Sequence, residues 1–168
     1  AQVPVMVAHA FKGFQDHTPT EAGLRRFGRV VAAAERTSVK IAFENTEGEE
    51  YLEALLRHFR GSPSVGFCWD AGHEMCYNHS QDILGTYGDR LLGTHLNDNL
   101  GIGSKDGEIT WLDDLHLLPF DGIADWERNA RRLADVGFAG PLTFELNVVS
   151  KPGRTENDVY AAMPYPDY

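Results

Sequence analysis

The sequence has little cysteine: Cys68 and Cys76 are the only two among 168 residues. Small secreted domains that depend on disulfides carry more of them. Cys68 also lies inside the apolar run VGFCW, which favours a buried thiol over half of a disulfide. We therefore expect no disulfide and a reducing, cytoplasmic location.

Long hydrophobic runs and a surplus of basic residues are absent as well. No apolar stretch approaches the roughly 18 residues that mark a membrane-spanning helix, so no membrane partner is expected. The chain has 15 Lys and Arg against 25 Asp and Glu, a formal net charge of −10. This charge repels polyanions, so no nucleic-acid partner is expected either. Residues 1–168 are predicted to form one globular domain, with an irregular Gly-, Pro- and Tyr-rich tail at 148–168.

Short apolar runs alternate with helical patterns along the chain. Strands are predicted for the runs at 3–8, 39–43, 65–69, 91–94 and 141–144, with a shorter one at 114–118. Helices are predicted after a cap at Thr18, over 49–59, around 81–87 and after a cap at Asp125. This alternation is typical of parallel α/β architecture. A closed (β/α)8 TIM barrel typically needs about 250 residues, so we expect an incomplete barrel that lacks about two βα units.

Four potential metal ligands each close a short apolar run, and their spacing is nearly periodic. They are Glu44, Asp70, His95 and Glu145, separated by 26, 25 and 50 residues. A step of roughly 25 to 35 residues is the length of one strand–loop–helix–loop unit. Side chains that recur once per unit at strand ends converge when parallel strands close into a barrel. Any one of the four could instead cap a loop, but four in phase favour a divalent-cation site, for which Mn²⁺, Mg²⁺, Co²⁺ and Zn²⁺ are all compatible.

Further candidate ligands accompany these four. His73 follows Asp70 in a D-x-x-H step, which can present two ligands from one turn. Asp114 and His116 form a D-x-H pair, whose side chains would point to the same side of the short strand predicted there. His9 ends the first strand and could reach the same mouth. Each could instead be an ordinary loop or core residue; together, His73, Asp114 and His116 form a candidate second metal site.

Five sequence strings carry a resemblance to a known family. They are IAFEN (41–45), VGFCWDAGH (65–73), THLNDN (94–99), DDLHLLPFDGIADW (113–126) and GFAGPLTFELN (137–147). In order and spacing they resemble the xylose isomerase-like TIM-barrel superfamily. The match is closest to its sugar phosphate isomerase/epimerase branch and more distant to endonuclease IV. The resemblance covers most of the chain from His9 to Asn147.

This resemblance implies roles for the residues that match the family's motifs. It implies that one divalent metal is bound by Glu44, Asp70, His95 and Glu145. The two glutamates would also act as the catalytic acid and base. His73 would contact substrate in an isomerase and bind a second metal in a nuclease.

The sequence also departs from the family pattern. The family's first two βα units have no counterpart here, which removes part of the substrate pocket. The family's Pro-Gly-Glu/Asp-Gly loop is replaced by Pro119-Phe120-Asp121-Gly122, so the local turn need not be the same. His9, His73, Asp114 and His116 are present and match positions that the three-zinc nucleases use.

Three functions follow from these observations, and we favour the first. It is a metal-dependent isomerase or epimerase of a small sugar or sugar phosphate, which works through an enediolate and uses His73 and His9 to bind substrate. The second is a zinc-dependent phosphodiester hydrolase of the endonuclease IV type, against which the net charge argues. The third is a catalytically incomplete barrel, either a truncated product or a chain that completes its barrel with a partner. A homo-oligomer is also left open.

Overall fold

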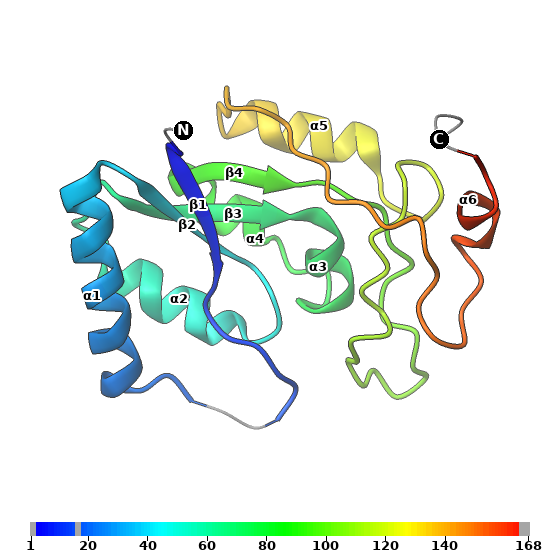
Figure 1. Ribbon diagram of the computed structural model, residues 1–168, viewed down its shortest axis with the longest axis horizontal. Helices are drawn as coiled ribbons and strands as arrows, with labels where there is room; N and C mark the ends of the chain where they lie inside the picture. Colours follow the sequence, from blue (N-terminus) through cyan, green and yellow to red (C-terminus); the bar gives the residue numbers. More distant parts are fainter. Residues whose placement is uncertain (1–2, 16–17, 165–168) are drawn as a thin grey trace.

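Four of the predicted apolar runs form parallel strands. The computed structural model of the protein describes residues 3–15 and 18–164. Its strands are β1 (Val5–His9), β2 (Lys40–Glu44), β3 (Val65–Asp70) and β4 (Leu91–His95), hydrogen-bonded in that order (Figure 1). The register places His9 beside Glu44 and Asp70 beside His95. The candidate ligands at the strand ends are therefore aligned along the carboxyl end of the sheet.

Helices connect the strands as predicted, with two differences. The helices are α1 (Glu21–Thr37), α2 (Glu49–His58), α3 (Ala71–Cys76), α4 (Ile83–Tyr87), α5 (Trp126–Asp135) and α6 (Asp158–Ala161), with a 3₁₀ turn at Gly88–Arg90. The cap of α1 is Thr20, whose side chain accepts from Gly23 N, and not Thr18 as predicted. The short helix α3 was not predicted and follows Asp70 directly, with Asp70 as its cap. Asp125 caps α5 as predicted, accepting from Arg128 N.

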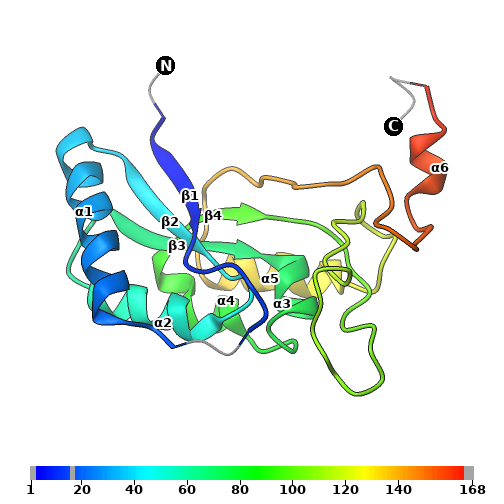
Figure 2. The ribbon, with the colours of Figure 1, turned by 60° about the horizontal axis from the view of Figure 1, so that its bottom comes forward.

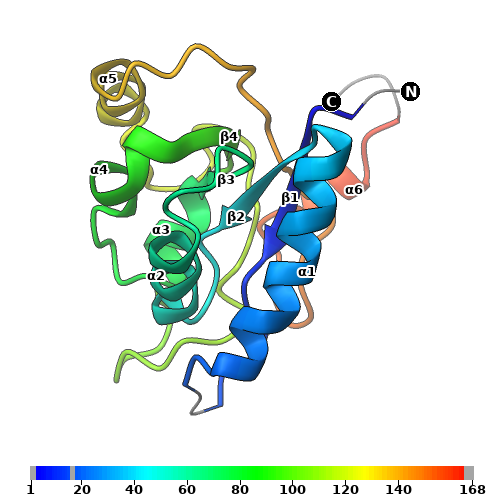
Figure 3. The same cartoon turned by 90° about the vertical axis from the view of Figure 1, so that its left-hand side faces the viewer.

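The hydrophobic core lies between the sheet and the helices. Side chains alternate along a strand, so Ile41 and Phe43 on β2 face the helices, as do Phe67 and Trp69 on β3. All four are fully buried, and α2 packs against them through Leu52, Leu55 and Leu56. Figure 3 shows α1, α2, α4 and α5 around the outer side of the curved sheet. The opposite alternation turns Glu44 and Asp70 toward the concave side.

Two predicted strands are reduced to single bridges. The run at 114–118 makes one antiparallel bridge, between Leu117 and Asp98, and the run at 141–144 makes one parallel bridge, between Phe144 and Leu96. The first run cannot stay extended because His116 has a φ of 51°. In addition, the buried carboxylate of Asp98 accepts hydrogen bonds from backbone N–H groups of the loop that follows this run. Without this carboxylate, those N–H groups would need other hydrogen-bond acceptors.

The described residues form an open sheet, which confirms the prediction of an incomplete barrel. The long segment between β4 and α5 and the tail bearing α6 lie together at the carboxyl end of β3 and β4 (Figures 1 and 2). Of the predicted irregular tail, residues 148–164 contain turns and the one-turn helix α6, and 165–168 lie outside the described residues. Both cysteines are buried free thiols, as expected for Cys68. Among the described residues, no helix combines the length and apolarity that a membrane crossing requires.

Candidate metal centre

The strand ends bring the four phased residues together. Glu44 ends β2, Asp70 ends β3 and His95 ends β4. Glu145 joins them because its backbone N–H donates to the carbonyl of Leu96, just beyond β4. One possible ligand atom from each of these residues lies within 4.8 Å of the others. We call these four the Glu44 cluster.

Glu44 is the centre of this cluster and is 1% exposed. Its Oε1 lies 3.1 Å from Nδ1 of His95 and 3.2 Å from Nδ1 of His73. Its Oε2 lies 3.3 Å from Nε2 of His9, whose side chain is half exposed. On its other side, Nδ1 of His95 lies 2.8 Å from Oε2 of Glu145. Two glutamates thus approach one imidazole from different elements.

Asp70 is held by its neighbours in one orientation. Its Oδ1 accepts from the backbone N–H of His73 at 2.7 Å, as the cap of α3. The side-chain amide of Asn97 donates to both carboxylate oxygens, at 3.2 and 3.0 Å. A Cβ on Gly72 would lie 1.8 Å from Oδ1 of Asn97, so only glycine admits this approach. Such hydrogen bonds orient a metal-binding carboxylate.

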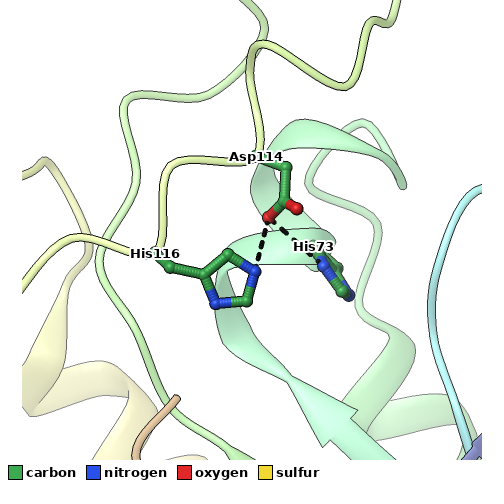
Figure 4. Close-up of side chains that lie close together, drawn as sticks. All are labelled: His73, Asp114 and His116. Atoms are coloured by element: carbon green, nitrogen blue, oxygen red, sulfur yellow. Dashed lines mark ion pairs between the residues drawn. The ribbon is translucent and has the colours of Figure 1, made fainter. Parts of the chain in front are cut away.

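A second group of ligand-type side chains lies next to the first. Figure 4 shows the carboxylate of Asp114 directed toward the rings of His73 and His116. Its Oδ1 lies 3.3 Å from Nε2 of His73 and 2.9 Å from Nε2 of His116. Suitable ligand atoms of all three residues again lie within 4.8 Å of one another. We call these three the Asp114 cluster. They meet as predicted, but through the loop conformation at His116 and not along a strand.

Backbone carbonyls determine which ring nitrogen of the two histidines carries a proton. Nδ1 of His73 lies 2.9 Å from the carbonyl oxygen of Asn45, and Nδ1 of His116 lies 2.9 Å from that of Glu145. A carbonyl can only accept, so each Nδ1 must donate. In the neutral ring, Nε2 then presents its lone pair to Asp114. This arrangement is typical of histidines that bind a metal through Nε2.

The charged groups of the site shift one another's pKa values in the direction opposite to the effect of burial. Burial alone would raise the pKa of the Glu44 carboxyl, but the imidazoles of His73, His9 and His95 outweigh it and lower that pKa. Burial alone would lower the pKa of His95, but Glu145 and Glu44 raise it to about 10.

The Asp114 cluster shows the same opposition. Burial would raise the pKa of Asp114, and His116 and His73 lower it instead. Burial would lower the pKa of His73, and Asp70 and Asp114 raise it well above its usual value. Carboxylates held ionised in this way stabilise positive charge, whether it is carried by protons or by a divalent ion.

The residues present fit a divalent cation. In the part of the chain that the structure describes, Glu44 Oε1, His95 Nδ1 and Asp114 Oδ1 are buried without a hydrogen-bond partner, because the short contacts above lack hydrogen-bond geometry. Buried polar atoms are rarely left in this way. The separations within the Glu44 cluster are nearly those that one ion spans with ligands at about 2.0–2.2 Å. Its three carboxylates and one imidazole suit Mn²⁺, Mg²⁺, Co²⁺ or Zn²⁺.

A pocket of about 450 Å³ opens beside both clusters. The residues that line it include His9, His73, Asp114, Tyr77, Trp111 and Lys151. Its volume is in the range of small-molecule sites. A ligand bound there would contact His73 and Asp114 of the Asp114 cluster, and also His9, which like His73 lies against Glu44.

A family model described as a xylose isomerase-like TIM barrel matches residues 3–162. The chain belongs to this family. The resemblance drawn from the five sequence strings is thereby confirmed.

A curated relative and several solved structures are similar to this chain over much of its length. An uncharacterised protein, y4fM, from Sinorhizobium fredii is 37% identical over 127 residues, which is 72% of this chain and 38% of y4fM. A xylose isomerase domain protein from Planctomyces limnophilus superposes with a TM-score of 0.66 at 17% identity, over 95% of this chain and 55% of that one. The 3-keto-D-glucoside 4-epimerase of E. coli gives a TM-score of 0.54 at 16% identity, over 92% and 61%. The chain thus spans less than two thirds of each of these relatives.

All eight predicted site residues lie at the carboxyl end of the sheet. They are His9, Glu44, Asp70, His73, His95, Asp114, His116 and Glu145, and their roles remain predictions. Sequence reasoning missed Asn97 and Lys151. Asn97 had a signal, since it follows His95 by two positions and so continues toward the same side. Lys151 had none, because the fold of the tail alone brings it to the pocket.

Proposed function

We propose that this protein is a divalent-metal-dependent isomerase or epimerase of a small sugar or sugar phosphate. The observation that carries this proposal is the convergence of the Glu44 cluster at the carboxyl ends of parallel strands, beside a pocket. That edge is where sites of TIM-barrel enzymes lie. Among structural neighbours, a D-tagatose 3-epimerase-like protein (TM-score 0.60, 19% identity) and the E. coli epimerase carry names of this chemistry.

The Glu44 cluster would hold the metal ion through its three carboxylates and the His95 imidazole. When bound, the ion supplies a Lewis acid that polarises a substrate carbonyl and favours loss of the proton on the neighbouring carbon. Asn97 would keep Asp70 oriented as a ligand. Glu44 and Asp70 are fully buried, so both start from rigid positions.

Glu145 and Glu44 would exchange protons with the substrate. The side chain of Glu145 is half exposed, so its carboxylate is open to a bound substrate and would accept the proton from a carbon. Oε2 of the buried Glu44 lies 3.3 Å from Nε2 of His9, which lines the pocket. Proton loss leaves an enediolate. Return of the proton to the adjacent carbon isomerises the sugar, and return to the opposite face of the same carbon epimerises it.

His73 and His9 would bind the substrate's oxygens. Both line the pocket, and both lie within 3.3 Å of Glu44. Since Asn45 fixes the ring of His73 through its carbonyl, His73 presents Nε2 in a defined direction. A sugar hydroxyl can donate to this nitrogen when the ring is neutral and accept from it when the ring is protonated.

Deuterium exchange tests the proposal. The Mn²⁺-loaded protein is incubated in D₂O with a panel of aldoses, ketoses and their phosphates, and deuterium next to the carbonyl is measured by NMR. We expect uptake with at least one compound, and a loss of about 10²- to 10⁴-fold in E145Q. The matched control E127Q alters an exposed glutamate of α5 that pairs with Arg131. No uptake across the panel would count against the proposal.

The Asp114 cluster favours a second candidate function, a zinc-dependent phosphodiester hydrolase. Its His73 and His116 present Nε2 toward one carboxylate, as in a site for an additional ion. Two adjacent ions can activate water and hold a phosphodiester. Release of nitrophenol from bis(p-nitrophenyl) phosphate by the zinc-loaded protein, together with two or three zincs per chain, would support this function.

The cytoplasmic location and the self-association of the protein stay predictions.

A further inference from the structure

Lys151 lies beside the Asp114 cluster and is anchored by groups outside both clusters. Its Nζ donates to the backbone carbonyl of Trp111 at 2.6 Å and lies 5.3 Å from the centre of the Trp111 ring. Its side chain is 16% exposed. The segment that carries it is held in turn by Ser150, which accepts from the backbone N–H of Asn157 and donates to Asp158. The ammonium therefore has a fixed place.

The third neighbour of this ammonium is Asp114. Nζ of Lys151 lies 3.4 Å from Oδ2 of Asp114, whereas Oδ1 of the same carboxylate faces His73 and His116. One carboxylate is therefore shared between a built-in cation and the space where a second metal ion would bind. Its charge cannot fully neutralise both.

Coulomb repulsion then acts on any second ion. An ion bound by Asp114 Oδ1 and the two Nε2 atoms would lie within a few ångströms of Lys151. Partial burial reduces screening by water and salt, so the repulsion between a divalent ion and an ammonium persists at that distance. Because the Trp111 contacts do not involve Asp114, the ammonium cannot move away without losing them.

We propose that Lys151 restricts this centre to one divalent ion by placing a fixed positive charge against Asp114. The inference rests on the proposed function only in assigning that ion to the Glu44 cluster. The Asp114 cluster then holds its ligand-type side chains for an oxygen of the substrate, next to Trp111 in the pocket. A chain of this family with a complete set of second-site ligands thus works with a single metal.

Metal stoichiometry tests this inference. Wild type, K151M, K151R and K105M are stripped of metal and titrated with Zn²⁺ and with Mn²⁺ by calorimetry, with bound metal counted by elemental analysis after dialysis. K151R keeps the charge, and K105M removes an exposed charge from the long loop. We expect one ion per chain in wild type, K151R and K105M. In K151M we expect a second ion, with an affinity for it at least about tenfold higher than in wild type.

Two further variants locate the added ion and guard against misfolding. In K151M/D114N the second ion should be lost, since its carboxylate is gone. Circular dichroism and thermal unfolding show whether K151M is destabilised. If it is, K151Q replaces it, because it also removes the charge but keeps a hydrogen-bond donor, and it should gain the second ion in the same way.

Several results would overturn the inference. The inference fails if wild type binds two or more ions per chain. It also fails if K151M matches K151R in the number of bound ions and in the affinity for them. An added ion that survives D114N would overturn it as well. The proposed function fails separately, if wild type exchanges no deuterium; the difference between K151M and K151R does not depend on that assay.

Discussion

The two ligand clusters lie side by side but are built in different ways. Strand ends present three of the four residues of the Glu44 cluster, and the sheet register fixes their relative positions. The Asp114 cluster takes two of its three residues from the loop between β4 and α5, where His116 adopts a left-handed backbone. Hydrogen bonds to Asp98 and the anchored Lys151 hold that loop.

This difference separates what the parallel sheet provides from what individual loop contacts provide. A parallel sheet brings its strand ends together whatever the loops do, so the Glu44 cluster follows from the architecture. The Asp114 cluster depends on individual loop contacts, each of which one substitution can remove. Function can therefore change at the Asp114 cluster while the Glu44 cluster stays intact.

The largest effect is expected when Glu44 is changed. E44Q keeps the shape of the side chain but removes the charge that three imidazoles surround. We expect Mn²⁺ affinity to fall at least about 100-fold, since even outer partners of a metal site are worth 10- to 100-fold. Deuterium exchange should fall about 10²- to 10⁴-fold, because an acid–base group is lost. Calorimetry and NMR measure the two quantities.

Two comparisons sharpen this result. E53Q alters an exposed glutamate of α2 that pairs with Arg57 and should leave both quantities unchanged. D114N should leave the Mn²⁺ affinity much closer to wild type than E44Q does, because the sheet holds the first ion's ligands. If D114N and E44Q weakened Mn²⁺ binding equally, the two clusters would have to be regarded as one unit.

A smaller effect is expected at Asp98, which supports the loop but not the sheet. Its buried carboxylate accepts from the backbone N–H groups of Asn99, Phe120 and Ala124 and from Nε1 of Trp126. D98A would leave these donors without their partner, so we expect the free energy of unfolding to fall by about 3 kcal/mol. Urea denaturation followed by tryptophan fluorescence measures it.

The same variant separates the clusters. Where D98A stays folded, Mn²⁺ binding at the Glu44 cluster should persist. In the double variant K151M/D98A, zinc should bind the Asp114 cluster more weakly than it does in K151M. D106N, at an exposed loop aspartate, is the control for the loss of one negative charge. A D98A protein as stable as wild type would show that the loop does not depend on this carboxylate.

The sequence predicted the sheet-built region well for a physical reason. Apolar runs of period two identify strands, and a polar residue that ends each run must lie at the same edge of a parallel sheet. Glu44, Asp70 and His95 were therefore placed correctly by their spacing alone. Glu145 was also placed correctly, although its run forms a single bridge and not a strand.

The loop-built region was predicted only in part. The meeting of Asp114 and His116 was expected from a strand that does not form, so the outcome was right and the reason was wrong. Lys151 was missed because its position depends on a tertiary contact, with the Trp111 carbonyl. Asn97 was missed although its spacing from His95 was a signal, because the contact with Asp70 that gives it a role is tertiary. The cap of α1 was misplaced by two residues, since Thr18 and Thr20 both precede a glutamate and only the backbone decides between them.

The smallest expected effect lies at His116, which joins the two clusters. Its Nδ1 donates to the backbone carbonyl of Glu145, in one cluster, and its Nε2 faces Asp114, in the other. Asparagine places a donor near the position of Nδ1, and glutamine places one near that of Nε2. H116N therefore keeps the link to Glu145, and H116Q keeps the link to Asp114.

We expect H116N to bind Mn²⁺ at the Glu44 cluster as wild type does. H116Q should bind it about two- to tenfold more weakly, since one neutral hydrogen bond contributes about 0.5–1.5 kcal/mol. Calorimetric titration of both variants measures the difference. Equal affinities would show that Glu145 is positioned by the sheet through Leu96 alone. Metal binding at the Glu44 cluster would then not depend on the loop.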